Sequence, residues 1–164
     1  MESAVMVAPQ DLVAIAHPFG TIEVSRDALM TFPVGGMFGF DKLTTFALVP
    51  AARQGLWWLM SPTSPPTTFV LADPFVCFPD YALDLGDLEK SQLEIERPED
   101  VLALVMLTIP EGGAPITANL RAPIVFNVTR RLAAQVLSRD ESHGLATAID
   151  LTVYPRSTNG LDMT

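Results

Sequence analysis

Short apolar stretches separated by turn residues recur along the whole chain. Residues 21–25 alternate apolar and polar side chains, the period-two pattern of a strand with one buried face. Prolines cannot donate a hydrogen bond within a sheet, and they fall between the stretches, where they mark connections. The pattern predicts about eleven strands, at residues 12–16, 21–25, 28–32, 45–49, 56–60, 68–72, 81–85, 101–109, 116–120, 124–129 and 133–138.

Two stretches differ from this pattern of half-buried strands. Residues 101–109 are apolar apart from Thr108 and are rich in β-branched side chains, which favours a strand buried on both faces. Residues 87–93 form the one predicted helix, in which Asp87 caps the first turn and Pro98 limits the length. Many short strands with frequent turns indicate an all-β antiparallel barrel or sandwich.

The composition fits a single folded domain. The chain has 164 residues, of which 49% are apolar. The longest apolar run, 101–107, is far too short to span a membrane, and the first residues lack the basic segment of a signal peptide. We therefore expect a cytoplasmic protein. The single cysteine, Cys77, excludes a disulfide scaffold, and its apolar neighbours indicate a buried reduced thiol.

The formal charge of −9 is unevenly distributed along the chain. Residues 73–100 contain nine acidic and two basic side chains, whereas residues 112–139 contain four arginines and no acid. An acidic protein is a poor direct ligand for nucleic acid, whose phosphates attract basic surfaces. The acidic segment has two interpretations: a surface that attracts a basic partner, or a solvated segment that maintains solubility. Charge alone favours the second.

No pattern of catalytic or metal-binding residues stands out, so we expect no catalytic residue, no metal and no cofactor. His17 and His143 lie far apart and have no metal-ligand spacing, and neither glycine pair continues into a phosphate-binding loop. One alternative stays open: a small-molecule-binding barrel, or a small cysteine-dependent hydrolase in which Cys77 and a histidine act as nucleophile and base.

Several aromatic side chains and one amide have two interpretations. Trp57 and Trp58 are adjacent, so in a strand they face opposite sides, one in the core and the other exposed or at an interface. Phe38 and Phe40 lie on a predicted glycine-rich turn at 35–41 and are either packed or available to a partner. Asn119, inside a predicted strand, is better explained as a hydrogen-bonded structural residue than as a ligand contact.

Several motifs, taken in order, resemble the bacterial flagellar assembly factor FliW family. The most specific is Thr-Ala-Asn-Leu-Arg-Ala-Pro-Ile-Val at 117–125, and the resemblance covers about residues 19–138. Met37 and Phe38 stand where the family usually has Leu-Pro, and Met60 stands where Gln is common. The other motifs are Phe-Pro-Val-Gly-Gly-Met-Phe-Gly-Phe-Asp at 32–41, Ala-Asp-Pro-Phe at 72–75, Phe-Pro-Asp-Tyr at 78–81, Arg-Pro-Glu-Asp-Val at 97–101 and Leu-Thr-Ile-Pro at 107–110.

The resemblance implies a non-enzymatic regulator with a small antiparallel β-barrel-like fold. Proteins of this family bind flagellin in the cytoplasm and, when free, bind the RNA-binding translational repressor CsrA, which relieves repression of flagellin mRNA. It implies a single domain at residues 17–145, after an extension at 1–16 whose first strand begins near residue 12. Residues 146–164 would form a partly flexible tail.

The resemblance also suggests two contact surfaces. A repressor that binds RNA has basic surface, so an acidic face would be complementary to it; its candidate residues are Asp80, Asp84, Asp87, Glu89 and Glu94. Flagellin's assembly-competent ends are amphipathic helices, which need an apolar surface; the candidates are Phe38, Phe40, Trp57 and Trp58. We expect no direct contact with nucleic acid or membrane.

Overall fold

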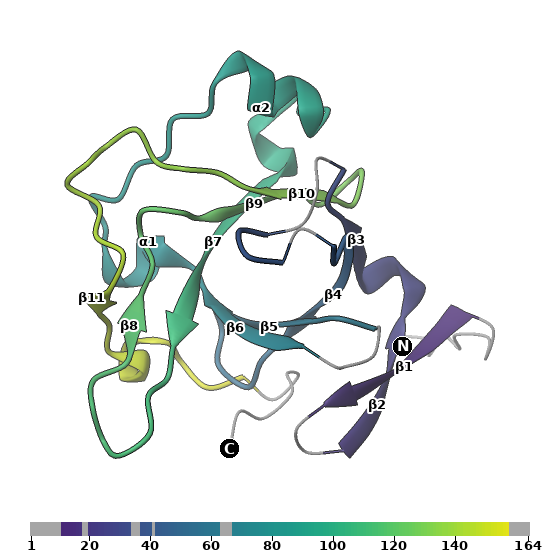
Figure 1. Cartoon of the computed structure of the whole chain (residues 1–164), viewed down its shortest axis with the longest axis horizontal. Helices are drawn as coiled ribbons and strands as arrows, with labels where there is room; N and C mark the ends of the chain where they lie inside the picture. The colour runs from purple at the N-terminus through teal and green to yellow at the C-terminus, as the bar shows by residue number, and fades with distance from the viewer. Residues whose placement is uncertain (1–10, 18–19, 34–36, 41, 63–66, 158–164) are drawn as a thin grey trace, which may run out of the picture.

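The computed structural model describes residues 11–17, 20–33, 37–40, 42–62 and 67–157. Seven strands form a closed barrel, which is seen from one end in Figure 1. The order around the barrel is β7-β6-β5-β4-β3-β10-β9, and β9 pairs with β7 to close it. The all-β barrel predicted from the sequence is therefore confirmed. Its strands are β3 (Leu29–Thr31), β4 (Thr45–Pro50), β5 (Leu56–Met60), β6 (Thr68–Ala72), β7 (Val101–Thr108), β9 (Ile124–Asn127) and β10 (Leu132–Gln135).

Strand β7 closes the barrel because it changes partner along its length. Its first four residues pair with β9, the next two with β6, and the last two with a short outer strand, β8 (Thr117–Ala118). Leu104 packs in the barrel interior, whereas Val105 and Leu107 pack in the apolar layer outside. The prediction of a strand covered on both faces is confirmed, and its continuous apolar sequence follows from that position.

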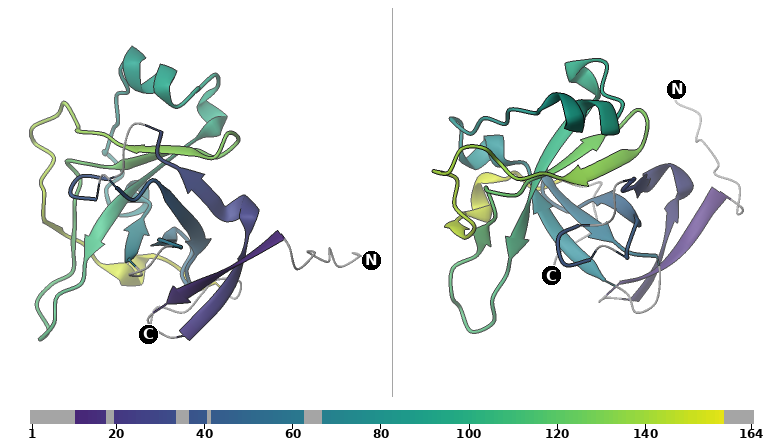
Figure 2. Two further views of the ribbon diagram at one scale, coloured as in Figure 1. Left: turned by 45° about the vertical axis from the view of Figure 1, so that its right-hand side comes forward. Right: turned by 45° about the horizontal axis from the view of Figure 1, so that its top comes forward.

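The remaining strands lie outside the barrel. β1 (Leu12–His17) and β2 (Gly20–Ser25) form an antiparallel hairpin, and β11 (Thr147–Ala148) extends the sheet beside β8. The views in Figure 2 show the hairpin projecting beside the barrel. Every pairing is antiparallel in the described residues except that of β3 with β10, which is parallel and joins Thr31 to Leu132.

The helices are short, and local residues explain where each begins. In α1 (Pro74–Cys77), the Asp73 carboxylate accepts a hydrogen bond from the Phe75 N–H, and proline occupies the first turn. α2 (Asp87–Gln92) matches the predicted helix, but its N-cap is Gly86 rather than Asp87. Asp87 instead lies in the first turn, where a negative charge favours the helix dipole. Within the described residues, single 3-10 turns also lie at Arg26–Ala28, Pro98–Asp100 and Leu151–Val153.

The apolar residues divide into three clusters. One fills the barrel interior and includes Phe46, Leu59 and Phe126. A second lies outside the barrel, beneath the β1–β2 hairpin and the C-terminal residues, and includes Trp58 and Tyr154. A third lies outside β9 and β10, beneath the segment that contains α2, and has Leu93 at its centre. Because the barrel has apolar residues on both sides of its wall, most strands are buried on both faces.

The described C-terminal residues pack against the barrel. Tyr154 is fully buried; its hydroxyl donates to the Asp73 carbonyl at 2.6 Å, and its own carbonyl accepts from Arg53 Nη1 at 2.8 Å. Residues 147–157, which the sequence assigned to the tail, therefore form part of the folded unit. The first ten residues, the last seven, and residues 35, 36 and 41 of the predicted turn lie outside the described residues.

Candidate protein-binding surface

The acidic segment crosses the outer surface of the barrel next to β7, β9 and β10. Leu83, Leu85 and Ile95 turn inward and pack on the third apolar cluster, around the fully buried Leu93. The predicted strand at 81–85 is wrong, because these residues have no strand pairing in the structure. Burial alternates here without strand pairing: Tyr81, Leu83 and Leu85 face the barrel, whereas Ala82 and Asp84 are exposed.

Asn127, at the end of β9, fixes the acidic segment to the barrel. Its fully buried amide donates to the carbonyl oxygens of Leu93 at 2.8 Å and Glu94 at 3.1 Å. Its side-chain oxygen accepts from the N–H groups of Thr129 and Arg130, both at 3.1 Å. All polar groups of the amide are thereby satisfied, as burial requires. The sequence prediction missed this residue, although a polar residue at the end of an apolar strand is a detectable signal.

Three of the five acidic candidates are free to meet a partner. Asp80, Asp84 and Asp87 are exposed and make no hydrogen bond or ion pair within the described part of the chain. Glu89 has a structural contact instead, since its carboxylate accepts from the Gly86 N–H at 3.0 Å. Glu94 lies 3.3 Å from Nη1 of Arg130 in an exposed ion pair.

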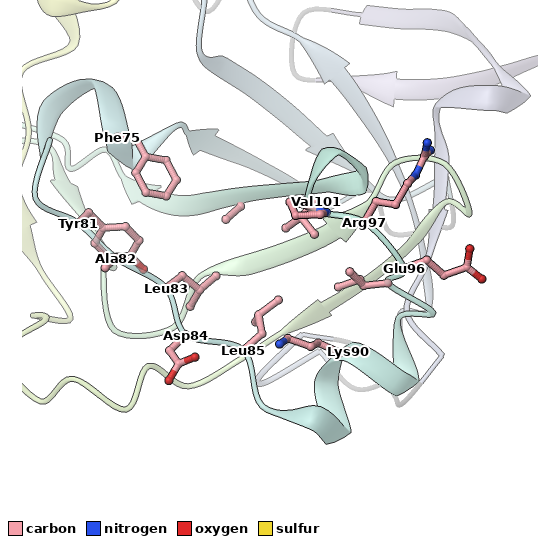
Figure 3. Close-up of a pocket in the computed structure, with 13 residues that line it drawn as sticks. Phe75, Tyr81, Ala82, Leu83, Asp84, Leu85, Lys90, Glu96, Arg97 and Val101 are labelled. Atoms are coloured by element: carbon pink, nitrogen blue, oxygen red, sulfur yellow. The ribbon is translucent and has the colours of Figure 1, made fainter.

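A groove of about 740 Å³ runs along the inner side of this segment, against β7 (Figure 3). Its floor and walls are mainly apolar, and Phe75 and Tyr81 lie at one end. Asp84, Lys90, Glu96 and Arg97 are its charged lining residues. The other apolar lining residues are Ala82, Leu83, Leu85, Ile95, Pro98, Val101 and Ala103.

Tyr81 is held rigidly at its end of the groove. Its hydroxyl donates to the Leu120 carbonyl at 2.9 Å, and burial raises the pKa of Tyr81 to about 12, so the donor stays protonated. The Phe75 ring meets it edge-on at 5.6 Å, and the His143 ring stacks on it at 4.5 Å. The wall at this end is therefore preorganised.

The structure gives Cys77 and His143 different partners and does not bring them together. The Cys77 thiol donates to the Asp150 carbonyl at 3.6 Å, and the residue packs on the outer apolar cluster. His143 Nδ1 lies 2.8 Å from Ser138 Oγ, and its Nε2 lies 3.6 Å from Asp140. That Oγ also accepts from the Asp140 N–H at 3.2 Å, and these contacts stabilise a loop. In the described ranges, no three His, Cys, Asp or Glu side chains gather as a metal site would require.

The four apolar candidates do not form one surface. Trp58 is 5% exposed in the outer cluster, whereas Trp57 is half-buried and packs with the barrel interior, so neither ring is fully presented to solvent. Phe38 is 57% exposed and Phe40 is 38% exposed. These two follow the buried Met37, whose side chain packs with the barrel interior.

Asn119 has the structural role expected from the sequence. Its side-chain oxygen accepts from the N–H groups of Arg121 at 3.1 Å and Ala122 at 3.0 Å, which shapes the turn after β8. Within the residues that the structure describes, no helix has both the length and the apolar character needed to cross a bilayer.

The fold defines a class: a small closed β-barrel whose outer layer carries an acidic, grooved surface. The model of the FliW protein family matches residues 14–149, and the chain belongs to this family. A crystal structure of the flagellar assembly factor FliW superposes with a TM-score of 0.73 at 32% identity, covering 90% of this chain and 99% of that one.

Curated relatives give the same assignment. The flagellar assembly factor FliW of Treponema pallidum is 38% identical over 117 residues, which cover 71% of this chain and 77% of that protein. The factor of the same name from Caldicellulosiruptor saccharolyticus is 35% identical over 136 residues, covering 83% of this chain and 89% of that protein. The family resemblance expected from the sequence motifs is confirmed.

Proposed function

We propose that this protein is a cytoplasmic flagellar assembly factor that acts by binding and not by catalysis. It binds flagellin and, when free of flagellin, binds a CsrA-type RNA-binding repressor and prevents it from silencing flagellin mRNA. Membership of the FliW family, whose curated relatives carry the name flagellar assembly factor, supports this function. The observation that supports it most directly is the exposed acidic segment, attached to the barrel by Asn127.

The repressor would meet the acidic face. Of the five acidic candidates, Asp80, Asp84 and Asp87 keep exposed carboxylates that have no partner among the described residues, whereas Glu89 and Glu94 contribute through the local structure. A surface that binds RNA phosphates is basic, so the two charges are complementary. The same carboxylates repel RNA when they lie within about 10 Å of its path, the distance over which salt screens them.

Flagellin would meet the aromatic pair at the barrel mouth. The exposed faces of Phe38 and Phe40 suit the apolar side of an amphipathic helix. Phe40 is supported from beneath, since the Phe69 ring meets it edge-on at 5.2 Å. The Phe38 N–H donates to Gln135 Oε1 at 2.8 Å, which holds the loop against β10. Trp57 and Trp58 pack in separate apolar clusters and are not assigned to this surface.

The test is binding of the purified protein to flagellin and to the repressor from the same bacterium. We expect the triple variant Asp80→Asn, Asp84→Asn, Asp87→Asn to associate with the repressor about three to ten times more slowly at low salt. The matched control neutralises three exposed acids elsewhere, Glu23, Glu111 and Glu141, as glutamines. Equal association rates for the two triple variants would contradict the acidic-face assignment, and failure to bind either partner would overturn the function.

A further inference from the structure

The groove between the acidic segment and β7 is an apolar site inside a charged surface. Its apolar side chains come from three separate elements: Phe75 from α1, Leu83 and Leu85 from the extended segment, and Val101 and Ala103 from β7. Phe75 is 46% exposed although it contacts Tyr81 edge-on. A large aromatic ring left this open next to a preformed groove is suited to contact with another molecule.

Charge indicates which kind of molecule fits. Asp84 lines the groove, and the neighbouring Asp80 and Asp87 also expose carboxylates without partners in the described residues. The basic Arg97 is already engaged, because it lies 3.2 Å from the mostly buried carboxylate of Asp100. Lys90 also lines the groove, and the Arg139 guanidinium lies beside Gly86. Because residues 73–100 carry nine acids against two bases, the surface around the groove still has a net negative charge, which is complementary to a basic partner surface.

We propose that this groove is the central contact for the repressor and receives an apolar side chain that its basic surface carries. The inference rests on the proposed function and assigns the repressor's central contact to a specific place. Stable interfaces combine a desolvated apolar centre with a polar rim, and the centre supplies most of the binding free energy. Here the groove forms the centre, and Asp80, Asp84 and Asp87 form the rim.

This division predicts that the two sets of residues affect different rate constants. Rim charges accelerate encounter and respond to salt, whereas a filled apolar centre slows dissociation. Groove variants should therefore dissociate faster without losing salt dependence. Rim variants should associate more slowly and show a weaker salt dependence.

The experiment measures association and dissociation rates of the repressor by surface plasmon resonance at several salt concentrations. Phe75→Ala removes one wall, and Ala82→Gln adds polar bulk at an exposed lining position where the fold tolerates it. Ile109→Ala is the matched control, because Ile109 is 51% exposed, similar to Phe75, and lies after the end of β7 and outside the groove. We expect both groove variants to dissociate about ten-fold faster, with association within two-fold of wild type and Ile109→Ala unchanged.

The outcomes separate the two proposals. If the wild type binds the repressor and both groove variants match its rates, the groove assignment is overturned while the proposed function stands. If the groove variants lose flagellin binding but keep repressor binding, the assigned occupant is wrong. If the wild type binds no repressor, the proposed function fails and the groove assignment fails with it. Thermal unfolding of each variant establishes that it is folded.

Discussion

At Asn127, a single amide joins two segments that are far apart in the sequence. It bonds to Leu93 and Glu94 on the acidic segment and to Thr129 and Arg130 on the turn after β9. Nearby, Thr129 Oγ1 donates to the mostly buried carboxylate of Asp100 at 2.6 Å. The turn after β9 is therefore a polar anchor for residues 93–100, the C-terminal part of the acidic segment.

The Asp100 contact makes stability depend on pH. The Thr129 hydroxyl, followed by Arg97, holds the pKa of Asp100 below its ordinary value of 3.8. The folded state therefore gains stability from ionised Asp100 above pH 3.8 and loses it as the pH falls through the lower folded-state pKa. We expect Thr129→Val to lower the thermal midpoint at pH 7, and the gap from wild type to narrow as the pH falls below 3.8. Calorimetric scans across this range measure the gap.

A variant that lacks the Asp100 carboxylate shows whether the pH dependence comes from this group. In Asp100→Asn, where there is no charge to stabilise, adding Thr129→Val should produce a shift in the midpoint that does not vary with pH. A gap between wild type and Thr129→Val that stays constant down to pH 2 would show that the hydroxyl acts without stabilising the ionised form of Asp100.

Single residues were predictable where their role is local. Asn119 bonds to residues two and three positions further on, so its role follows from the turn sequence itself. Asn127 and Trp58 depend on segments brought in from elsewhere, and only the complete fold shows which ones. The adjacent tryptophans were expected to face opposite sides of the strand, and they do: Trp58 is buried in the outer cluster and Trp57 is half-buried against the barrel interior. Neither ring is fully exposed, because the barrel wall has apolar layers on each side.

Among the elements, the C-terminal 3-10 turn shows how a segment without strong periodicity joins the fold. Tyr154 follows this turn and packs beside Gly55, which has a positive φ of +90°. A Cβ at Gly55 would lie 2.9 Å from Cδ1 of the buried Tyr154 ring. Glycine is therefore required at this position for two reasons: it tolerates the positive φ, and it has no side chain to collide with Tyr154.

Gly55→Ala should lower the free energy of unfolding by about 2–3 kcal/mol, because backbone strain adds to the displacement of Tyr154. Chemical denaturation measures the loss. Gly113→Ala is the matched control, since Gly113 also has a positive φ, of +81°, but nothing within 4 Å of an added Cβ. Its cost should be about 1 kcal/mol, from backbone strain alone. Equal losses for the two variants would show that the Tyr154 contact contributes nothing.

Strands were predicted correctly where an apolar pattern belongs to a segment that pairs with another strand, and incorrectly where the segment packs on the barrel without such pairing. Residues 81–85 alternate like a strand but cover the barrel without pairing. The two-residue strand β11 is too short to have a pattern of its own and depends on β8 for its existence. Helix α1 was missed although Asp73 and Pro74 are a recognisable start signal, because the whole helix has only four residues.

At the scale of the whole molecule, folding brings arginines of the acid-free segment 112–139 next to acids of other segments and neutralises part of the excess negative charge. Arg130 from the acid-free segment lies 3.3 Å from Glu94 and 3.7 Å from Glu96, and Arg131 lies 2.7 Å from Asp27. Folding therefore pairs some of the excess acids with these arginines. Asp80, Asp84 and Asp87 make no ion pair with any residue that the structure describes, so sequence charge alone overstated the acidic face and could not locate its free part.

We expect resistance to local unfolding to be higher in the strands that close the barrel than in the β1–β2 hairpin. The β7–β9 pairing closes the barrel, and its residues are covered on both faces. The β1–β2 hairpin pairs only with itself in the described residues and attaches through Ile15 and Val24. We expect amides of 101–106 and 124–127 to exchange with deuterium only on global unfolding, and those of 12–16 and 21–25 to exchange earlier. Equal protection of both regions, measured by mass spectrometry, would contradict this order.

The parallel contact between β3 and β10 has a consequence for synthesis. Because it joins Thr31 to Leu132, and β9 is also made late, a ribosome must translate most of the chain before the barrel can close. Until then, the β3–β6 meander carries an open edge and uncovered interior side chains such as Phe46. The nascent chain is most vulnerable to aggregation in this interval, and emergence of residues 124–135 ends it.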